Sequence, residues 1–269
     1  MKRLLCLLLV LGLLLAGCGK KKTMEQPETE PVITTKTVYV HRSITRTQGT
    51  TIGRTDYLYN DENLLTDVIM SDGDGKELQR YLVTCDENGN PVEWASAADN
   101  MVTYAYDAQG RTLRTETYVG QVLMTSTEYT WSGNLRVSAI VKTSTQEQRT
   151  EYAYDEKGGM TRQDMYVDGV LSGYGLYTLN EEGKALLCQT FDPQGNPLTE
   201  VTYEYQGNTE KRITTDLQGQ VQQTQILTYD DHGNLLQNNL KDGSGADLLL
   251  EVHEWMPLEV SLESVRASV

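Results

Sequence analysis

The chain has 269 residues, with 38 acidic and 23 basic side chains, a net charge of −15 and a pI near 4.6. This excess of negative charge argues against a nucleic-acid-binding protein, because the phosphate backbone requires a basic surface. The length allows one or two domains with a real core, and a hydrophobic content of 38% is far from that of a bundle of membrane-spanning helices.

The N-terminus predicts a targeting signal. Lys2 and Arg3 precede an almost unbroken run of Leu and Val from Leu4 to Leu15. This run is too short for a bilayer span, which needs about 20 apolar residues. It ends in Leu-Ala-Gly-Cys at residues 15–18, which resembles the lipobox of bacterial lipoproteins.

That resemblance implies a lipid anchor. Signal residues 1–17 would be cleaved between Gly17 and Cys18, and the Cys18 thiol would carry a diacylglyceryl group, with the new amino terminus acylated as well. Two or three lipid chains hold a protein durably on a membrane. We therefore expect a protein on the extracytoplasmic side of the cell membrane or outer membrane; an ordinary signal peptide that happens to contain a cysteine is the alternative.

Residues 18–36 predict the lipidated cysteine and a flexible tether. This segment contains two of the six prolines and few large apolar side chains, so it cannot bury enough surface to fold. Lys20, Lys21 and Lys22 lie beside the anchor and either contact anionic headgroups or form a solvated charge run. Residues 37–54 then predict an N-terminal strand or cap.

Residues 55–245 contain an internal repeat. The segment YAYDAQGRTL (104–113) recurs as YAYDEKGGM (152–160), YTLNEEGKAL (177–186) and LTYDDHGNL (227–235), with variants at 57–65, 83–92, 129–135 and 203–208. A fixed period of roughly 24 residues indicates a repeat architecture. The turn residues of the eight copies are Asn63, Gly89, Gly110, Gly133, Gly158, Gly183, Gly207 and Gly233.

Most periods also contain a second turn near the middle, for example at Gly120, Asp168-Gly169 and Gly219. The segments between turns are short and rich in Thr, Tyr, Val and Leu, which is typical of β-hairpins. No window has a sustained helical period. The sequence therefore predicts an all-β fold, an up-and-down meander of about sixteen short strands from eight repeats.

The size of this meander limits its shape. Open sheets rarely exceed about ten strands without curling, splitting or closing, so the array should coil into a spiral or trough, or close on itself. The abundant Thr and Gln predict a thin layer. Residues 246–269 include the most apolar part of the mature chain and predict a C-terminal cap and tail.

The Y-x-Y-D-x-x-G-[RN]-x-L pattern resembles the YD repeat, also called the Rhs repeat, of bacterial surface and toxin proteins. In large relatives, the resemblance implies, such hairpins spiral into a shell around a toxin domain. Only about 24 residues follow the last repeat here. We therefore expect a small YD-repeat lipoprotein without a toxin domain.

Catalytic and metal-binding patterns are not found in the sequence. The three histidines are far apart, and no known catalytic or phosphate-binding motif occurs. Asp72 and Asp74 resemble the start of a calcium loop, but the later ligands are missing, so a hairpin turn is the better explanation. Cys85 and Cys188 lie about four repeats apart and are expected to be free unless the sheet closes or rolls over. We predict no enzyme activity, no metal and no cofactor.

Aromatic side chains two residues apart are the one feature with functional potential. Members of each pair share a face of a strand, and successive repeats would stack them into a ladder. Cross-strand aromatic pairs stabilise sheets, so a structural role is the alternative to a groove for glycans or extended chains. The candidate binding residues are Tyr104, Tyr106, Tyr129, Trp131, Tyr152, Tyr154, Tyr203 and Tyr205.

These features together predict a lipid-anchored cell-envelope protein. Its repeat domain would be a non-enzymatic binding or scaffold module, for cell-wall glycan or another surface protein. The main alternative is a lipid or lipoprotein carrier with an apolar concave sheet; a less favoured one is an enzyme that acts on the envelope. The carrier requires one continuous apolar face, which the Thr and Gln content argues against.

Overall fold

The computed structural model describes residues 35–261, and every element in that range is a β-strand. The strands are β1 (Thr35–Gln48), β2 (Thr51–Tyr59), β3 (Leu65–Asp72), β4 (Glu77–Cys85), β5 (Pro91–Ser96), β6 (Asn100–Tyr106), β7 (Thr112–Val119), β8 (Val122–Ser132), β9 (Leu135–Thr143), β10 (Glu147–Tyr154), β11 (Met160–Val167), β12 (Val170–Leu179), β13 (Ala185–Phe191), β14 (Pro197–Gln206), β15 (Thr209–Thr215), β16 (Val221–Tyr229), β17 (Leu235–Asp242) and β18 (Asp247–Ser261). The all-β prediction is confirmed. There is no helix in the described range that could cross a membrane.

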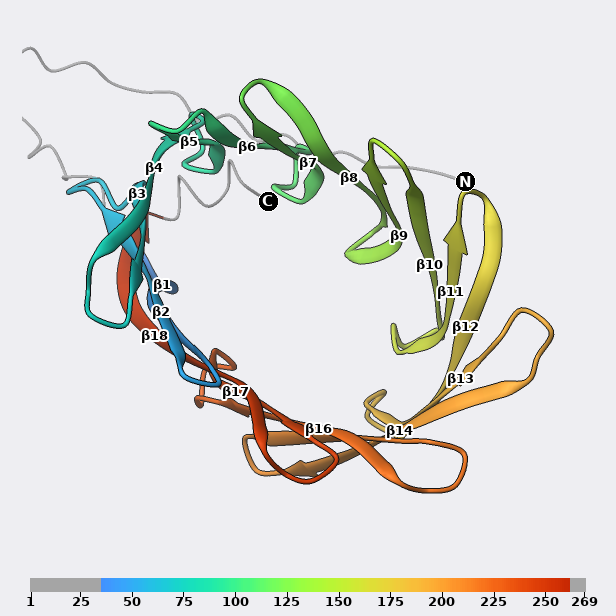
Figure 1. Cartoon of the computed structure of the whole chain (residues 1–269). Coiled ribbons are helices and arrows are strands. Elements are labelled where there is room, and N and C mark those ends of the chain that lie inside the picture. Colours follow the sequence, from blue (N-terminus) through green and yellow to red (C-terminus); the bar gives the residue numbers. More distant parts are fainter. Residues whose placement is uncertain (1–34, 262–269) are drawn as a thin grey trace, which may run out of the picture. The chain divides into compact units, whose positions relative to one another are not determined.

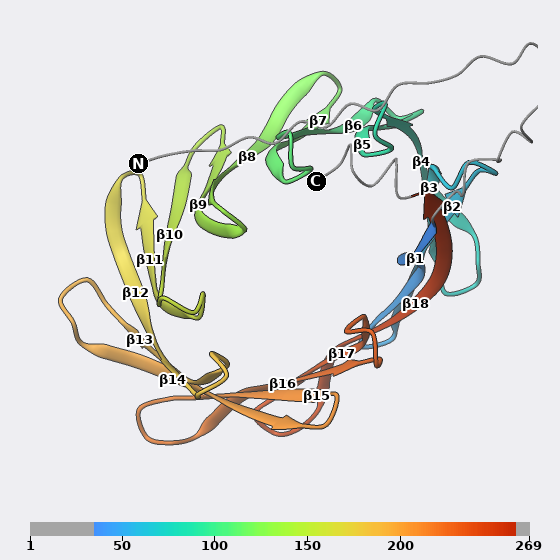
Figure 2. The same ribbon diagram turned by 180° about the vertical axis from the view of Figure 1, so that it is seen from behind.

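The meander closes on itself. Each strand is antiparallel to the next, and β1 pairs with both β2 and the last strand, β18. The sheet therefore forms the ring seen in Figures 1 and 2. Of the expected arrangements, spiral, trough or closed sheet, the closed one is correct. At about 4.8 Å between strands, a ring of this size is roughly 30 Å across.

The eight predicted turn residues all lie at one rim of the ring. Each has a positive φ, from 55° at Gly207 to 85° at Gly158 and Gly233, as tight turns require. We call this the terminal rim, because β1 begins and β18 ends there. The turns at the opposite rim, the distal rim, include the mid-period turns. In both figures the turn between β8 and β9 lies inside the ring outline while the β7–β8 hairpin points outward.

One hydrogen-bond pattern explains why Asp and Gly recur at a fixed spacing. Asp107 Oδ1 accepts the backbone N–H groups of Gln109 and Arg111, both at 2.9 Å. The Gly110 N–H donates to the Asp107 carbonyl at 3.0 Å. Turns with the same side-chain bonds begin at Asn60, Asp72, Asp86, Asp155, Asn180, Asp192, Asp216, Asp230 and Asp242. The Asp72 carboxylate, considered above for calcium, is therefore part of a hairpin turn.

Most strand pairings contain a β-bulge next to a turn. Thr112 pairs with Tyr106 and Arg114 pairs with Ala105, which leaves Leu113 as the extra residue. Equivalent bulges follow the turns into β3, β5, β11, β13 and β17. A bulge bends its strand and increases the local twist, so a bulge in nearly every hairpin supplies curvature that helps the sheet to close.

The two ends of the described chain form a ninth repeat unit. β18 takes the place of a strand before a repeat turn, and β1 takes the place of the strand after it. β1 has the same bulge, at Arg42, between His41 and Ser43, which pair with Trp255 and Glu254. Where the other units turn, β18 and β1 continue as a two-stranded ribbon for six more residue pairs. The prediction of sixteen strands was therefore two too low.

The seam between β1 and β18 contains a histidine pair. His41 Nε2 lies 3.2 Å from His253 Nδ1, and the His41 ring centroid is 3.7 Å from that of Trp255. Burial lowers the pKa of His41, and His253 lowers it further. Burial also lowers the pKa of His253; Arg46 adds to this effect, while Glu251 opposes it. Both rings therefore favour the neutral state in the folded protein.

This pair predicts a loss of stability on mild acidification. Because both pKa values are lower in the folded chain, the unfolded chain binds more protons. The contribution of the two neutral rings to the free energy of unfolding is complete above the pKa of histidine in the unfolded chain, about 6.5. It is lost as the pH falls through the lower pKa values of the folded chain. Urea denaturation between about pH 7.5 and 5.5 should show a flatter pH dependence for His41→Gln/His253→Gln than for the parent. An identical slope in the parent and the double variant would contradict this account.

The sheet has only a small core, as expected for a thin layer. Among residues 35–261, the buried apolar side chains are Leu65, Val68, Cys188 and Leu227. Cys188 is buried and Cys85 is half-buried, and both thiols are free although the sheet closes. Stability therefore depends on the hydrogen-bonded ladders and on contacts between neighbouring repeats.

Candidate functional site

The strand register places the eight candidate aromatic residues on one face of the sheet, which we call the aromatic face. Tyr104 pairs with Thr115, and Thr115 pairs with Thr127, which lies two residues before Tyr129 in β8. Paired residues and residues two apart share a face. The pairings of Ala139 in β9 connect the aromatic face of β8 to that of β10 in the same way. The pairings of the later strands extend this face to β14.

The opposite face, the charged face, carries rows of ion pairs. Arg80 Nη1 lies 3.0 Å from Asp67 Oδ1, and Lys211 Nζ lies 3.1 Å from Glu204 Oε2. Both pairs are open to solvent on at least one side, so each contributes little to stability. Neither face presents the continuous apolar surface that the carrier alternative requires.

The eight candidate rings do not form a continuous ladder, although Trp94 links Tyr81 to Tyr104 across β4–β6. The guanidinium carbon of Arg136 lies 5.6 Å from the ring centroid of Tyr129 and 5.0 Å from that of Tyr152, so an arginine separates successive repeats. Among the eight candidates, the one ring pair found in the described residues lies within a single strand, between Tyr104 and Tyr106. Cation–π contacts of this kind are favourable and occupy ring faces that a ligand would need.

Several aromatic side chains also fasten each repeat to the one before it. The side chain at the last aromatic position of a repeat unit donates a hydrogen bond to a backbone carbonyl beside the bulge of the preceding strand; we call this bond a latch. The donor–acceptor pairs are Tyr59 and His41, Tyr106 and Pro91, Trp131 and Thr112, Tyr154 and Arg136, Trp255 and Leu235, and, through the thiol, Cys85 and Leu65.

The latch supplies a hydrogen-bond donor to a backbone carbonyl that the bulge takes out of the ladder. Its acceptor carbonyl lies beside the bulge, where the extra residue disrupts the ladder, and a buried carbonyl without a partner is costly. Burial raises the pKa of Tyr106 to about 12, so its hydroxyl stays protonated and can donate. Tyr106, Trp131 and Tyr154 are therefore structural residues in this ring.

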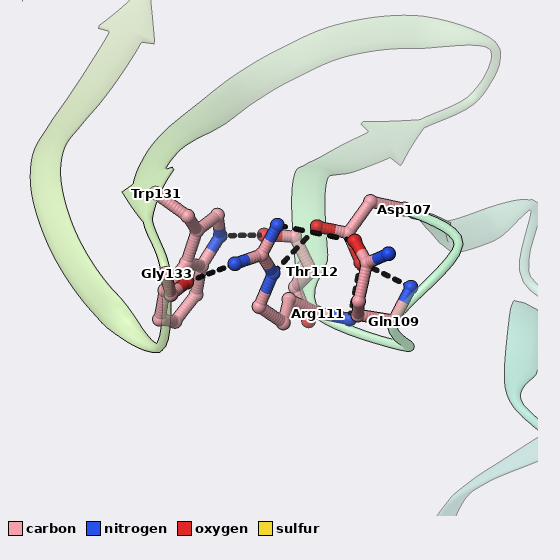
Figure 3. A network of polar contacts seen from close by, with 6 residues as sticks. All are labelled: Asp107, Gln109, Arg111, Thr112, Trp131 and Gly133. Atoms are coloured by element: carbon pink, nitrogen blue, oxygen red, sulfur yellow. Dashed lines mark hydrogen bonds and ion pairs between the residues drawn. The ribbon is translucent and has the colours of Figure 1, made fainter. Parts of the chain in front are cut away.

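Figure 3 shows the latch of Trp131 together with the Arg111 side chain that packs beside its ring. The Trp131 Nε1–H donates to the Thr112 carbonyl at 2.8 Å. Arg111 fills the space beside the ring: its guanidinium carbon lies 5.8 Å from the ring centroid, its Nε is 2.6 Å from Asp107 Oδ2, and its Nη1 donates to the Gly133 carbonyl. These contacts hold the ring, the guanidinium and the carboxylate together as one unit.

The latch is missing over one sector of the ring. The equivalent positions there are Leu179, which has no donor, and Tyr205 and Tyr229, whose hydroxyls donate no hydrogen bond to any residue between 35 and 261. Burial raises the pKa of both tyrosines. A cavity of about 340 Å³ lies here, lined by Lys184, Tyr205, Gly207, Asn208, Thr209, Glu210, Tyr229, Asp230, Asp231 and Gly233.

Of the candidate binding residues predicted from the sequence, only Tyr205 lines this cavity. Tyr229 was missed because it was treated as part of a turn motif, and Lys184 because it lies outside the aromatic pattern. A column-by-column alignment of the repeats could have found both, since Lys184 stands where Arg111 stands and Tyr229 stands where Tyr106 and Tyr154 stand. Tyr177 also lies on the aromatic face and was not among the candidates.

Metal and catalytic chemistry gain no support from the geometry. Within the part of the chain that the structure describes, no three His, Cys, Asp or Glu side chains come together as metal ligands. The absence of enzyme activity stays a prediction. Gly17 and Cys18, the predicted cleavage and lipidation residues, lie outside the described residues.

Comparisons with known proteins give distant likenesses. A family model described as "Uncharacterised protein" matches residues 94–179. No curated protein sequence matches the chain. The crystal structure of TcdB2-TccC3-Cdc42 is similar with 11% identity and a TM-score of 0.40, over 79% of this chain and 14% of that one.

Two porin-like proteins are also similar. The one from Bacteroides uniformis has 12% identity and a TM-score of 0.43, over 80% of this chain and 96% of its own. The one from Bacteroides vulgatus has 10% identity and a TM-score of 0.35, over 81% of this chain and 99% of its own. All of these likenesses are too distant to carry a functional assignment.

Proposed function

We propose that this protein is a lipid-anchored component of the bacterial cell envelope, a small member of the YD-repeat type. Cys18 carries the lipid, residues 19–34 act as the tether, and the closed ring is a non-enzymatic binding or scaffold module on the extracytoplasmic side. Envelope glycan or another surface protein is its partner.

The position of the chain ends is the observation that supports this function best. Thr35 pairs with Ser261, so the described chain enters and leaves the ring at the terminal rim. Sixteen tether residues span at most about 55 Å and as a random coil about 22 Å. An anchor at Cys18 would therefore hold the terminal rim towards the membrane and leave the distal rim free to meet a partner.

The distal rim has the surface of a contact region. The strands beside several of its turns begin with exposed aliphatic side chains, such as Val170 at 70% and Leu78 at 64% exposure. Exposed apolar side chains that form a patch are typical of protein contact sites. The lipid-carrier alternative lacks comparable support, because charged and Thr-rich faces line the sheet.

Lipid attachment is tested by metabolic labelling of the full-length chain in a bacterial host with an alkyne-bearing fatty acid. The parent should be labelled and should partition with membranes, since the Cys18 thiol is the predicted acceptor. Cys18→Ser should lose both properties. Cys6→Ser is the matched control, because Cys6 lies within the predicted signal, and it should keep the label. A labelled Cys18→Ser protein, or an unlabelled parent, would refute the anchor.

A further inference from the structure

One strand at the distal rim has an edge without a partner. β4 pairs with β3 from residue 77 to residue 82, but on its other side the ladder with β5 begins only at Tyr81, because β5 ends at Ser96. Within residues 35–261, no strand pairs with residues 77–80 on that side. In an antiparallel ladder every second residue points its N–H and C=O to the same neighbour, so about two residues here present both groups without a strand to receive them.

A cavity of about 440 Å³ lies beside this free edge. One wall is the edge itself, with the side chains of Leu78 and Leu82, which are 64% and 63% exposed. The other wall is the β5–β6 turn, where Ala97 and Ala98 line the cavity. The small alanine side chains leave the space open, so the edge and the turn form an apolar groove.

β14, which follows the same kind of turn and contains the same bulge, shows how such an edge is protected. It begins with Pro197 at the position of Glu77, and proline cannot donate a hydrogen bond to an added strand. In β4 residues 77–80 contain no proline, and their two charged side chains are paired: Arg80 lies 2.8 Å from Glu77 and 3.0 Å from Asp67. An unprotected edge beside an apolar groove is the geometry that accepts an extra β-strand.

The charges around the groove favour one kind of occupant. The adjoining turns carry Asp72, Asp74 and Asp99 but a single basic residue, Lys76. A second copy of this chain would bring two acidic rims together, and an anionic lipid surface would be repelled in the same way. A segment that combines an apolar side chain with Lys or Arg complements both the groove and its surroundings.

We propose that the groove between β4 and the β5–β6 turn binds an extended basic segment of a partner protein as an added β-strand. The N–H and C=O groups of that segment pair with residues 77–80, and an apolar side chain packs on Leu78 and Leu82. Its Lys or Arg side chains meet the aspartates of the adjoining turns. This inference rests on the proposed role as an envelope binding module, and it specifies the partner as a protein that meets the distal rim.

The test measures the fluorescence anisotropy of a labelled octapeptide, Ser-Lys-Val-Leu-Val-Lys-Val-Ser, with the full-length protein in a non-ionic detergent. We expect saturable binding. Replacing both lysines with glutamate should weaken it by about tenfold or more. N-methylation of one of the two sets of alternate residues should do the same, because only one edge of the peptide faces β4. Failure of the lysine peptide to saturate, or full binding by both N-methylated peptides, would overturn the proposal.

Variants of the protein locate the binding. Leu78→Ser/Leu82→Ser should weaken it by about tenfold with little change in stability, since both side chains are exposed. Leu248→Ser/Val252→Ser is the matched control, because these residues occupy the same positions in β18 and are each 42% exposed; it should bind like the parent. Full binding by the Leu78→Ser/Leu82→Ser protein, or an equal loss in the control, would refute the site.

A second groove variant acts from the opposite wall. Ala98→Arg lies in an exposed turn, so the fold should tolerate it, and the arginine both fills the groove and repels a basic peptide. Retained binding in this variant would also refute the site.

Analytical ultracentrifugation without peptide tests the other occupant. We expect a monomer; a dimer that Leu78→Ser/Leu82→Ser dissociates would assign the edge to a second copy and overturn the proposal. Fatty-acid labelling at Cys18 is measured independently, so a labelled protein that binds no peptide refutes the strand-addition site alone.

Discussion

Replacing Thr45 with proline is expected to open the ring. Thr45 lies in the part of β1 that is paired on both sides, with Val252 of β18 on one side and Arg54 of β2 on the other. Proline has no N–H for the ladder and is tolerated only at sheet edges, so it should cost about 3 kcal/mol or more. Loss of this strand would expose the edges of β2 and β18, which favours aggregation. Urea denaturation with analytical ultracentrifugation measures both effects.

Val38→Pro is the control for that experiment. Val38 lies in the ribbon beyond the ring and pairs with Leu258 of β18 only. At Val38, β1 is paired on one side only. The free energy of unfolding should therefore fall by clearly less in Val38→Pro than in Thr45→Pro. Equal effects of the two prolines, or a Thr45→Pro protein as stable as the parent, would contradict the role of β1 as the closing strand.

The second large effect is expected for Trp131→Ala. This change removes a half-buried indole, the latch to the Thr112 carbonyl and the ring beneath the Arg111 guanidinium. Truncation of a fully buried tryptophan costs about 3–5 kcal/mol, so a half-buried one with an orphaned carbonyl should cost about 2–3 kcal/mol. Trp131→Phe keeps the packing and loses the bond, and should cost about 1 kcal/mol. Thermal and urea unfolding give both values.

Tyr205→Ala provides the comparison, since Tyr205 occupies the same repeat position as Trp131 but has no latch. Its free energy of unfolding should change by less than about 1 kcal/mol, as for other exposed positions. If Trp131→Ala were as mild as Tyr205→Ala, the latch would have no structural importance. The glycan-groove interpretation of Trp131 and its neighbours would then regain support.

The turns were predictable because their chemistry is local. An Asp or Asn followed three residues later by Gly satisfies its own backbone through the side-chain bonds seen at Asp107, and this needs no information from distant parts of the chain. The shared face of each aromatic pair was equally predictable, because side chains two apart in a strand point the same way.

Closure could not be predicted, because it depends on residues about 200 positions apart. The strand of the ninth unit before the missing turn carries His253 and Trp255 in place of two tyrosines, and no Asp-x-x-Gly follows. Its partner, β1, precedes the first recognisable repeat. The latches could not be predicted for another reason. Their acceptors are backbone carbonyls beside bulges, and the position of a bulge depends on how two strands pair.

The sector without latches lies between these two cases. Each of its side chains is visible in the sequence, yet Lys184 and Tyr205 gain meaning only when their counterparts Arg111 and Trp131 are known to fill the equivalent space. A departure from a repeat is informative once the structure shows what the repeat normally does.

Joining the chain ends covalently tests the closed ring most directly. In the chain from residue 24 onward, Thr37→Cys/Glu259→Cys replaces two paired residues whose side chains touch at 2.5 Å. A closed ring predicts nearly complete formation of an intramolecular disulfide on mild oxidation, seen as a mobility shift on non-reducing gels. Because the bond closes a loop of more than 200 residues, it should raise the free energy of unfolding by up to about 5 kcal/mol. An open or spiral sheet would leave both new thiols free and reactive towards maleimide after the same oxidation, and that result would contradict the ring.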